Sequence, residues 1–228
     1  FITMSKKVLA DLKSISQSKP TKLVAHPLYD NFGEAVPKKE ARRKLGLPEE
    51  ARLALFFGFI RPYKGLDLLL KAMAEERVYK AGIGLVVAGE FYENSEPYLK
   101  MIKELGLEHR VVLRTEFIPD SMVRYYLCAA DVVVQPYKNA TQSGVTPLAY
   151  HFEKPMIVTK VGALPDMVPH LKAGLVAEPE PKNLAMNLEN FFQLGENFFL
   201  PHLREEKKKY AWSHMVRAIE ELCDGIQK

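Results

Sequence analysis

The chain has 228 residues, of which 47% are hydrophobic and 26% charged, a composition typical of a folded domain with a sizeable core. Its 32 lysines and arginines and 28 acidic residues give a net charge of only +4, and the cations are scattered rather than gathered in one stripe. This pattern argues against nucleic-acid binding, and it fits an anionic small ligand or an anionic membrane surface equally well.

Short apolar segments alternate with amphipathic ones along most of the chain. The pattern predicts strands at 22–25, 53–57, 84–88, 111–114, 132–135, 156–159 and 174–177. It predicts helices at 41–45, 66–74, 98–105, 122–130, 145–152 and 184–192. Apolar strands that alternate with helices are typical of a parallel sheet covered on both faces. We therefore predict an α/β fold, a doubly wound Rossmann-like parallel sheet with helices on both faces.

Two further helices are expected at the ends of the chain. One covers about residues 5–15, and the other covers about residues 203–222, after a break at 195–201. Cys128 and Cys223 both lie inside apolar helical patterns, which favours two buried free thiols. Because the sequence starts on Phe1 without an initiator methionine, we expect the chain to be a piece of a longer protein.

The sequence shows no cysteine pair and no histidine cluster at ligand spacing, so we expect no metal and no cofactor. Its apolar runs are too short to span a bilayer, and its first residues lack the apolar segment of a secretory signal. These features predict a cytoplasmic protein.

The first segment with chemical interest is the loop Gly58–Gly65, between a predicted strand and a predicted helix. A helix N-terminus beside two cations, Arg61 and Lys64, favours anions. Arginine offers a planar fork and lysine a point charge, a combination suited to a diphosphate. A solvated basic loop that caps a helix explains this motif equally well when it is taken alone.

The second segment follows the predicted strand 132–135 and is rich in small and polar residues. It contains Thr141, Gln142, Ser143 and Gly144 and enters a predicted helix at Val145. Hydroxyl and amide groups there suit phosphate or sugar hydroxyls, although an ordinary helix cap explains them equally well. Since the carboxyl ends of parallel strands share one edge, we predict a diphosphate site between the two loops.

Six blocks of the chain, in register and spread over nearly its whole length, resemble the C-terminal domain of glycosyltransferase family 4, the retaining GT-B enzymes. Besides Phe1–Ser5, they are His26–Asp30, Gly58–Leu70, Val86–Gly89, Ala130–Pro136, and Lys154–Thr159 taken with Val161–Asp166. The resemblance implies a hexosyltransferase-type enzyme that binds a nucleotide-diphosphate sugar donor in this domain. It implies retaining transfer to a saccharide or lipid-linked acceptor bound on an N-terminal domain.

The resemblance also divides the chain. Residues 1–20 would close or link the absent N-terminal domain, 21–200 would form the nucleotide-sugar-binding domain, and 201–228 would form the C-terminal crossover helix. The implied partners are the donor, the acceptor and the protein's own N-terminal domain, with no nucleic acid. Polysaccharide biosynthesis, with peripheral contact at the inner membrane face, is a family-level expectation, and the isolated domain is expected to be inactive.

Matching the family's motifs assigns expected roles to individual residues. Lys64 matches the diphosphate-binding lysine, whereas Phe59 occupies the place of the usual arginine, so Arg61 is the candidate replacement. Both cations are expected to act in catalysis by stabilising the leaving diphosphate. The expected donor-binding residues, which include the position of the base-contacting loop, are Gly58, Glu90, Phe117, Ile118, Thr141, Gln142, Ser143, Gly144 and Val145.

One departure from the family is larger. Its two glutamates, spaced by seven residues, fall on Ala140 and Leu148 in this sequence. We therefore expect Gln142, Ser143 and Gly144 to bind the sugar and phosphates in a variant enzyme. Two alternatives stay open: a nucleotide-sugar-binding module that has lost catalysis, and another GT-B-like enzyme such as an epimerase. The epimerase is the weaker alternative because the histidine and acidic residues it would need are not apparent.

Overall fold

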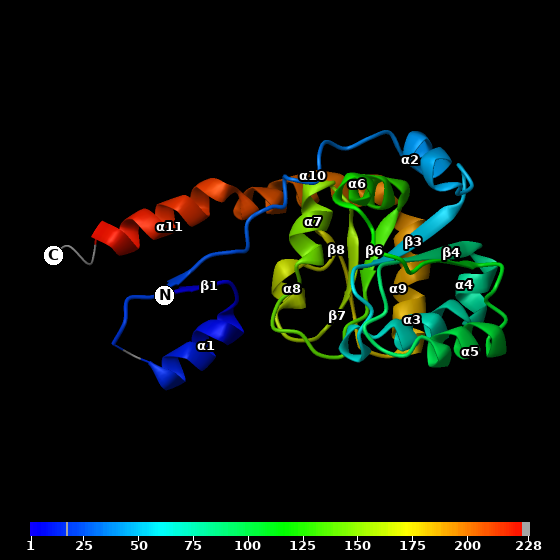
Figure 1. Cartoon of the computed structure of the whole chain (residues 1–228), viewed down its shortest axis with the longest axis horizontal. Coiled ribbons are helices and arrows are strands. Elements are labelled where there is room, and N and C mark those ends of the chain that lie inside the picture. The colour runs from blue at the N-terminus through cyan, green and yellow to red at the C-terminus, as the bar shows by residue number, and fades with distance from the viewer. Residues whose placement is uncertain (17, 225–228) are drawn as a thin grey trace.

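The computed structural model describes residues 1–16 and 18–224, and its centre is a six-stranded parallel sheet. The strand order is β5-β4-β3-β6-β7-β8 (Figure 1). The chain adds strands on one side of β3 first and then on the other side, as in doubly wound folds. The strands are β3 (Arg52–Phe57), β4 (Ile83–Ala88), β5 (Val111–Arg114), β6 (Val132–Gln135), β7 (Met156–Thr159) and β8 (Gly174–Ala177). The predicted fold class is confirmed, and the last four strands have the predicted bounds.

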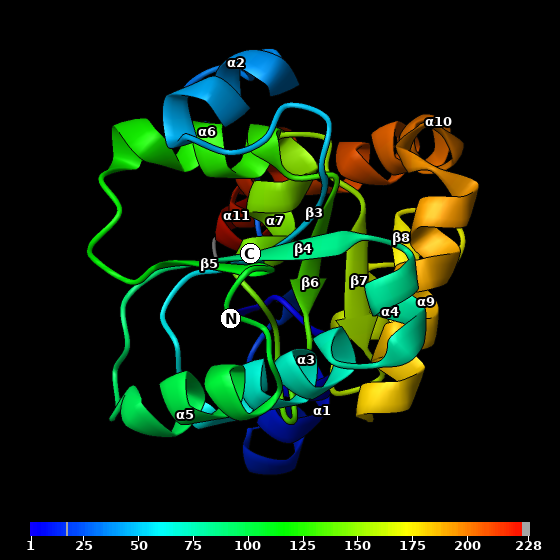
Figure 2. The same ribbon diagram turned by 90° about the vertical axis from the view of Figure 1, so that its right-hand side faces the viewer.

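Helices cover both faces of this sheet, as the apolar strands require (Figure 2). One face carries α2 (Lys38–Leu45), α6 (Asp120–Ala129), α7 (Val145–His151) and α8 (Leu164–Met167). The other carries α3 (Leu66–Met73), α4 (Glu76–Lys80), α5 (Glu96–Glu104) and α9 (Pro181–Leu194). Alternate residues of each strand face opposite ways, so Leu55 packs in the first core and Phe56 in the second.

The predicted strand 22–25 does not belong to the main sheet, and that part of the prediction was wrong. It is reduced to β2 (Lys22–Leu23), which pairs in parallel with β1 (Ile2–Thr3) as a separate sheet at one end of the molecule (Figure 1). Its lysine and its half-exposed leucine cannot fill a strand that is covered on both faces. Between β1 and β2 lies α1 (Lys6–Ile15), which Ser5 caps by accepting from the N–H of Val8 (3.2 Å).

The C-terminal part is divided differently from the single helix predicted at 203–222. It consists of α10 (Glu196–Lys207), the 3-10 turn η2 (Lys208–Tyr210) and α11 (Trp212–Asp224), which extends away from the sheet (Figure 1). The break falls at Tyr210 because its ring is buried and stacks on Tyr150, with ring centroids 4.6 Å apart. Cys223 lies on α11 and is exposed, so only Cys128 is the predicted buried thiol. None of the helices in the described residues is long and apolar enough to cross a membrane.

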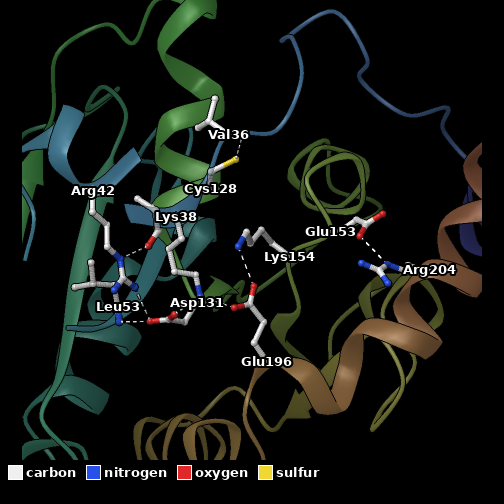
Figure 3. A network of polar contacts seen from close by, with 11 residues as sticks. Val36, Lys38, Arg42, Leu53, Cys128, Asp131, Glu153, Lys154, Glu196 and Arg204 are labelled. Carbon is white, nitrogen blue, oxygen red and sulfur yellow. Dashed lines mark hydrogen bonds and ion pairs between the residues drawn. The ribbon is translucent and has the colours of Figure 1, made fainter. Parts of the chain in front are cut away.

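A network of charged side chains ties the helices together at the edge where the strands begin (Figure 3). Asp131, just before β6, accepts from the Leu53 backbone N–H (2.8 Å), from Lys38 (2.6 Å) and from Arg42 (3.0 Å). Glu196, the first residue of α10, forms ion pairs with Lys38 and with Lys154 (2.8 Å) at the same edge. Because the Arg42 side chain is only 3% exposed, its charge depends on this network.

Replacing Asp131 with asparagine is therefore expected to lower the free energy of unfolding by about 2–4 kcal/mol, since it leaves the buried Arg42 without a counter-ion. Urea denaturation measures this loss. The control is Glu178→Gln, which breaks an exposed ion pair with Lys160 (3.1 Å) and should cost less than about 0.5 kcal/mol. Equal losses in the two variants would show that the network does not stabilise the fold.

Candidate active site

A pocket of about 350 Å³ opens where the adjacent strands β3 and β6 end. The loops that follow these strands form it, together with the segment between β2 and α2. Parallel α/β sheets bind their ligands at this edge. The lining residues are Tyr29, Phe32, Phe57, Gly58, Phe59, Tyr63, Lys64, Tyr137, Gln142, Ser143, Gly144, Val145 and Leu148.

The two predicted loops touch through their backbones. Gly65 has a φ of 70°, and a Cβ built on it would lie 1.9 Å from the carbonyl oxygen of Pro136. The N–H of Lys138 donates to the carbonyl of Tyr63 (2.7 Å), and the Lys138 ammonium pairs with Asp67 (2.8 Å). Only a glycine at position 65 permits this approach, so the sequence fixes the distance between the loops.

The loop after β7 supports the second of these loops from the other side. Gly162 has a φ of 53°, and a Cβ on it would lie 1.5 Å from the carbonyl oxygen of Ala140. The Thr159 hydroxyl donates to the carbonyl of Tyr137 (2.5 Å). Residues 137–144 are therefore held between two glycine contacts, which positions the polar groups that follow Ala140.

Lys64, at the end of the 3-10 turn η1 (Pro62–Lys64), is the charged residue that lines the pocket, and it is only 9% exposed. Its burial, with a smaller contribution from the positive charge of Arg61, lowers the pKa of Lys64 to about 8. In the part of the chain that the structure describes, it forms no ion pair. Its Nζ lies 5.9 Å from the centre of the Tyr137 ring and 3.2 Å from where a Cβ of Gly58 would stand. A buried ammonium without a counter-ion is costly, and an anion in the pocket would supply one.

Arg61 is exposed and lies at the rim rather than in the pocket lining. Its guanidinium stacks over the ring of Tyr92, 4.7 Å from the centroid, and Tyr92 in turn contacts Phe59 with centroids 4.4 Å apart. The structure therefore does not bring Arg61 and Lys64 together as side chains of one pocket. Arg61 acts on the pocket through its charge, which contributes to the lowered pKa of Lys64.

Ser143 is the buried polar residue of the second loop. Its Oγ accepts from the N–H of Val145 (3.2 Å) and lies 3.1 Å from the hydroxyl oxygen of Tyr137. Among the described residues, the backbone N–H groups of Gln142, Ser143 and Gly144 donate to no protein acceptor. The pocket thus combines the Lys64 ammonium with the backbone N–H groups of 142–144, all of them unpaired among the described residues. The Val145 N–H is not such a donor, because it donates to Ser143. Thr141 is exposed and does not line the pocket.

Three of the predicted donor-binding residues lie on neighbouring loops outside the pocket lining. The carbonyl of Glu90 accepts from the N–H of Ile60 (2.7 Å), which fixes its backbone beside the first loop. Phe117 is 65% exposed between β5 and α6, and the half-buried Ile118 packs on the core. These residues share the edge of the sheet with the pocket but do not contribute to its wall.

The two positions that lack the family's glutamates have different surroundings. Ala140 is buried against Gly162, whereas Leu148 is buried and lines the pocket, giving it an apolar wall. Within the described residues, no group of three or more histidine, cysteine, aspartate or glutamate side chains could hold a metal ion.

Sequence reasoning missed the aromatic part of the pocket. Tyr29 and Phe32 come from an irregular segment that only the tertiary fold brings to this edge. The hydroxyl of Tyr29 lies 3.3 Å from Nε2 of His26. The resemblance of 26–30 to a family loop was the available signal, but it singled out no side chain.

Similarity to known proteins supports this architecture. The model of the family "Glycosyl transferases group 1" matches residues 37–211. A D-inositol 3-phosphate glycosyltransferase of Mycolicibacterium gilvum is 30% identical over 212 residues, which are 91% of this chain and 48% of that protein. The chain thus spans about half the length of the curated relatives it matches.

Solved structures show the same fold. A glycosyltransferase from Rickettsia africae superimposes with a TM-score of 0.85 at 15% identity, over 100% of this chain and 63% of that one. Anabaena HepE in complex with UDP-glucose superimposes with a TM-score of 0.79 at 20% identity, over 99% of this chain and 63% of that one. The chain belongs to the glycosyl transferases group 1 family, and its fold is that of the C-terminal domain of a GT-B glycosyltransferase.

Proposed function

We propose that this chain binds the nucleoside diphosphate part of a sugar donor, and that the whole protein transfers the sugar to a saccharide or lipid-linked acceptor with retention. The observation that carries the proposal is Lys64, a buried ammonium without a carboxylate partner among the described residues. It lines the same pocket as the unpaired backbone N–H groups of 142–144. HepE, which shares the fold, is described in complex with UDP-glucose, and this supports the same class of ligand here.

The chemistry follows from the charges. When the bond between the anomeric carbon and the phosphate oxygen breaks, the leaving nucleoside diphosphate gains negative charge. The ammonium of Lys64 and the backbone donors of Ser143 and Gly144 would stabilise that charge where it develops. Arg61, from the rim, would add attraction over a longer distance.

Retention imposes a second condition. A double displacement needs an enzymic nucleophile such as a carboxylate, and the residues that line the pocket include no aspartate or glutamate. We therefore propose that the acceptor attacks from the face that the leaving phosphate departs from, and that this phosphate accepts the proton of the acceptor hydroxyl.

The other half of the reaction belongs to the remainder of the protein. Since this chain spans about half of its curated relatives, we propose that an N-terminal domain binds the acceptor and completes the cleft. The proposed setting is the cytoplasmic face of the membrane, in the assembly of a polysaccharide.

The test is turnover by the full-length protein. Uridine-, guanosine- and adenosine-diphosphate sugars are offered with saccharide and lipid-linked acceptors, and release of nucleoside diphosphate is measured. We expect turnover with donors of one base, and a product whose anomeric proton coupling in NMR matches that of the donor. An inverted product would contradict retention, and failure to bind or use any donor would contradict the whole proposal.

A second function is favoured by one observation, the replacement of both family glutamates by Ala140 and Leu148. A module that binds nucleotide without transferring sugar would keep the pocket and lose these carboxylates. In the same experiment, that module would bind a nucleoside diphosphate but release none from any donor sugar.

A further inference from the structure

Tyr137 lines the pocket and contributes a buried hydroxyl that the proposed chemistry has not used. It is 4% exposed, and burial raises the pKa of Tyr137 above its usual value, so the hydroxyl keeps its proton. In the part of the chain that the structure describes, the Oγ of Ser143 is its one hydrogen-bond partner, at 3.1 Å. The direction of this hydrogen bond decides what Ser143 offers to the pocket.

Either direction leaves one of the two hydroxyl protons without a protein acceptor among the described residues, so the donor and acceptor strengths of the two hydroxyls decide it. A phenol is a stronger donor and a weaker acceptor than an aliphatic hydroxyl, so donation from Ser143 to Tyr137 would be the weaker arrangement and would leave the stronger donor unpaired. If Tyr137 donates to Ser143, its proton is satisfied. The Ser143 Oγ then accepts twice, from Tyr137 and from the Val145 N–H (3.2 Å), and both of its lone pairs are used.

The hydroxyl proton of Ser143 is then the one donor of this pair that remains unpaired. Among the described residues it has no protein acceptor, and Ser143 lines the pocket beside Lys64. A hydroxyl whose lone pairs are both engaged can only donate, so it favours an acceptor with negative charge.

We propose that Tyr137 is a positioning residue that makes the Ser143 hydroxyl an obligatory donor to a phosphate oxygen of the nucleoside diphosphate. This inference rests on the proposed function and adds to it a specific role for a pair of side chains. Tyr137 does not touch the ligand through its hydroxyl but acts through Ser143. The Tyr137 ring stays in place in a phenylalanine variant, so the hydroxyl is tested alone, while Thr159 still holds the backbone carbonyl (2.5 Å).

The experiment is a double-mutant cycle on nucleotide affinity with this chain. UDP, GDP and ADP are first titrated calorimetrically into the wild-type chain. The nucleoside diphosphate that binds tightest is then titrated into each variant, and the matching nucleoside serves as a second probe that lacks phosphate. We expect Ser143→Ala to weaken nucleoside diphosphate binding about tenfold and Tyr137→Phe about fivefold. In the Ser143→Ala background, Tyr137→Phe should change the affinity by less than about twofold, and nucleoside affinity should be unchanged throughout.

The matched control is Tyr150→Phe. Tyr150 is also fully buried and donates to a protein acceptor, the carbonyl of Met167 (2.7 Å), but it lies outside the pocket. It should lower stability in denaturation without changing nucleotide affinity. Denaturation curves for all variants confirm that each is folded at the titration temperature.

The outcomes distinguish failure of the role of Tyr137 from failure of the proposed function. Additive losses in the cycle, or equal losses for nucleoside and nucleoside diphosphate, would overturn the role of Tyr137 while the proposed function stands. If the wild-type chain binds none of the three nucleoside diphosphates, the proposed donor site fails and this inference fails with it.

Discussion

Replacing Lys64 with methionine is expected to weaken nucleoside diphosphate binding by about 30- to 100-fold and to stabilise the unliganded chain. Methionine fills similar space without charge, so the variant loses the charge-assisted contact to phosphate. It also removes the cost of holding an ammonium that is 9% exposed and unpaired among the described residues. The shift of the Lys64 pKa from 10.5 to about 8 corresponds to a penalty of about 3 kcal/mol at neutral pH, which the methionine variant removes.

The pH dependence of stability provides a sharper form of the same prediction. Between pH 8 and 10.5 the unfolded chain keeps the Lys64 proton and the folded chain loses it, because burial lowers the folded-state pKa to about 8. The unfolded state binds more protons in this window, so the contribution of Lys64 to the free energy of unfolding rises with pH. Below pH 8 the full penalty for the charged form is present. Nucleotide affinity should change in the opposite sense and weaken above pH 8.

Urea denaturation of the wild type and Lys64→Met at pH 7, 8, 9 and 10 measures this effect. The difference in stability between the two should shrink as the pH rises. Lys71→Met is the control, because Lys71 is exposed on the outer side of α3. It should alter neither stability nor nucleotide affinity appreciably. A Lys64→Met variant that is less stable than the wild type at pH 7 would contradict the view that this charge is held at a cost for a ligand.

Replacing Gly65 with alanine is expected to cost about 3–5 kcal/mol of stability and to abolish measurable nucleotide binding. The new Cβ would stand 1.9 Å from the Pro136 carbonyl oxygen, so the two pocket loops would have to separate. The left-handed backbone, with φ 70° and ψ 30°, adds about 1–2 kcal/mol for any residue with a Cβ. Separation of the loops would also move Lys64 away from the donors of 142–144.

Gly46 provides a control with nearly the same backbone. It ends α2 with φ 65° and ψ 33°, and a Cβ there would meet nothing within 4 Å. Gly46→Ala should therefore show only the conformational cost of about 1–2 kcal/mol and unchanged nucleotide affinity. Thermal or urea unfolding of the two variants, with calorimetric titration of UDP, GDP and ADP, compares them. Equal losses would mean that the approach of the two loops does not shape the site.

The sheet could be predicted from sequence because its strands are buried on both faces and therefore apolar throughout. The runs Val132–Gln135 and Met156–Thr159 leave little choice of bounds. The segment 22–25 failed because a short apolar run is consistent with either a central strand or a small peripheral pair. The C-terminal helices were misjudged because Tyr210 is fixed by packing on Tyr150, a contact distant in sequence.

The site could be predicted where a residue with suitable side-chain chemistry lies on a loop that directly follows a predicted strand. Lys64 and Ser143 follow strands that end at one edge, and the structure places both in one pocket. The location of Arg61 at the rim could not be inferred, because it depends on a stack with Tyr92 from another loop. Tyr29 and Tyr137 were missed as pocket residues since neither periodicity nor spacing marks an aromatic side chain as part of a site.

The most direct test of the donor site is a crystal structure of this chain with the nucleoside diphosphate that binds tightest among UDP, GDP and ADP. We predict that the diphosphate lies between the Nζ of Lys64 and the backbone N–H groups of 142–144, with the Ser143 Oγ at 2.6–3.0 Å, about the usual hydrogen-bond length, from a phosphate oxygen. A nucleotide bound with its phosphates away from Lys64 and Ser143 would contradict the assignment of this pocket as the donor site.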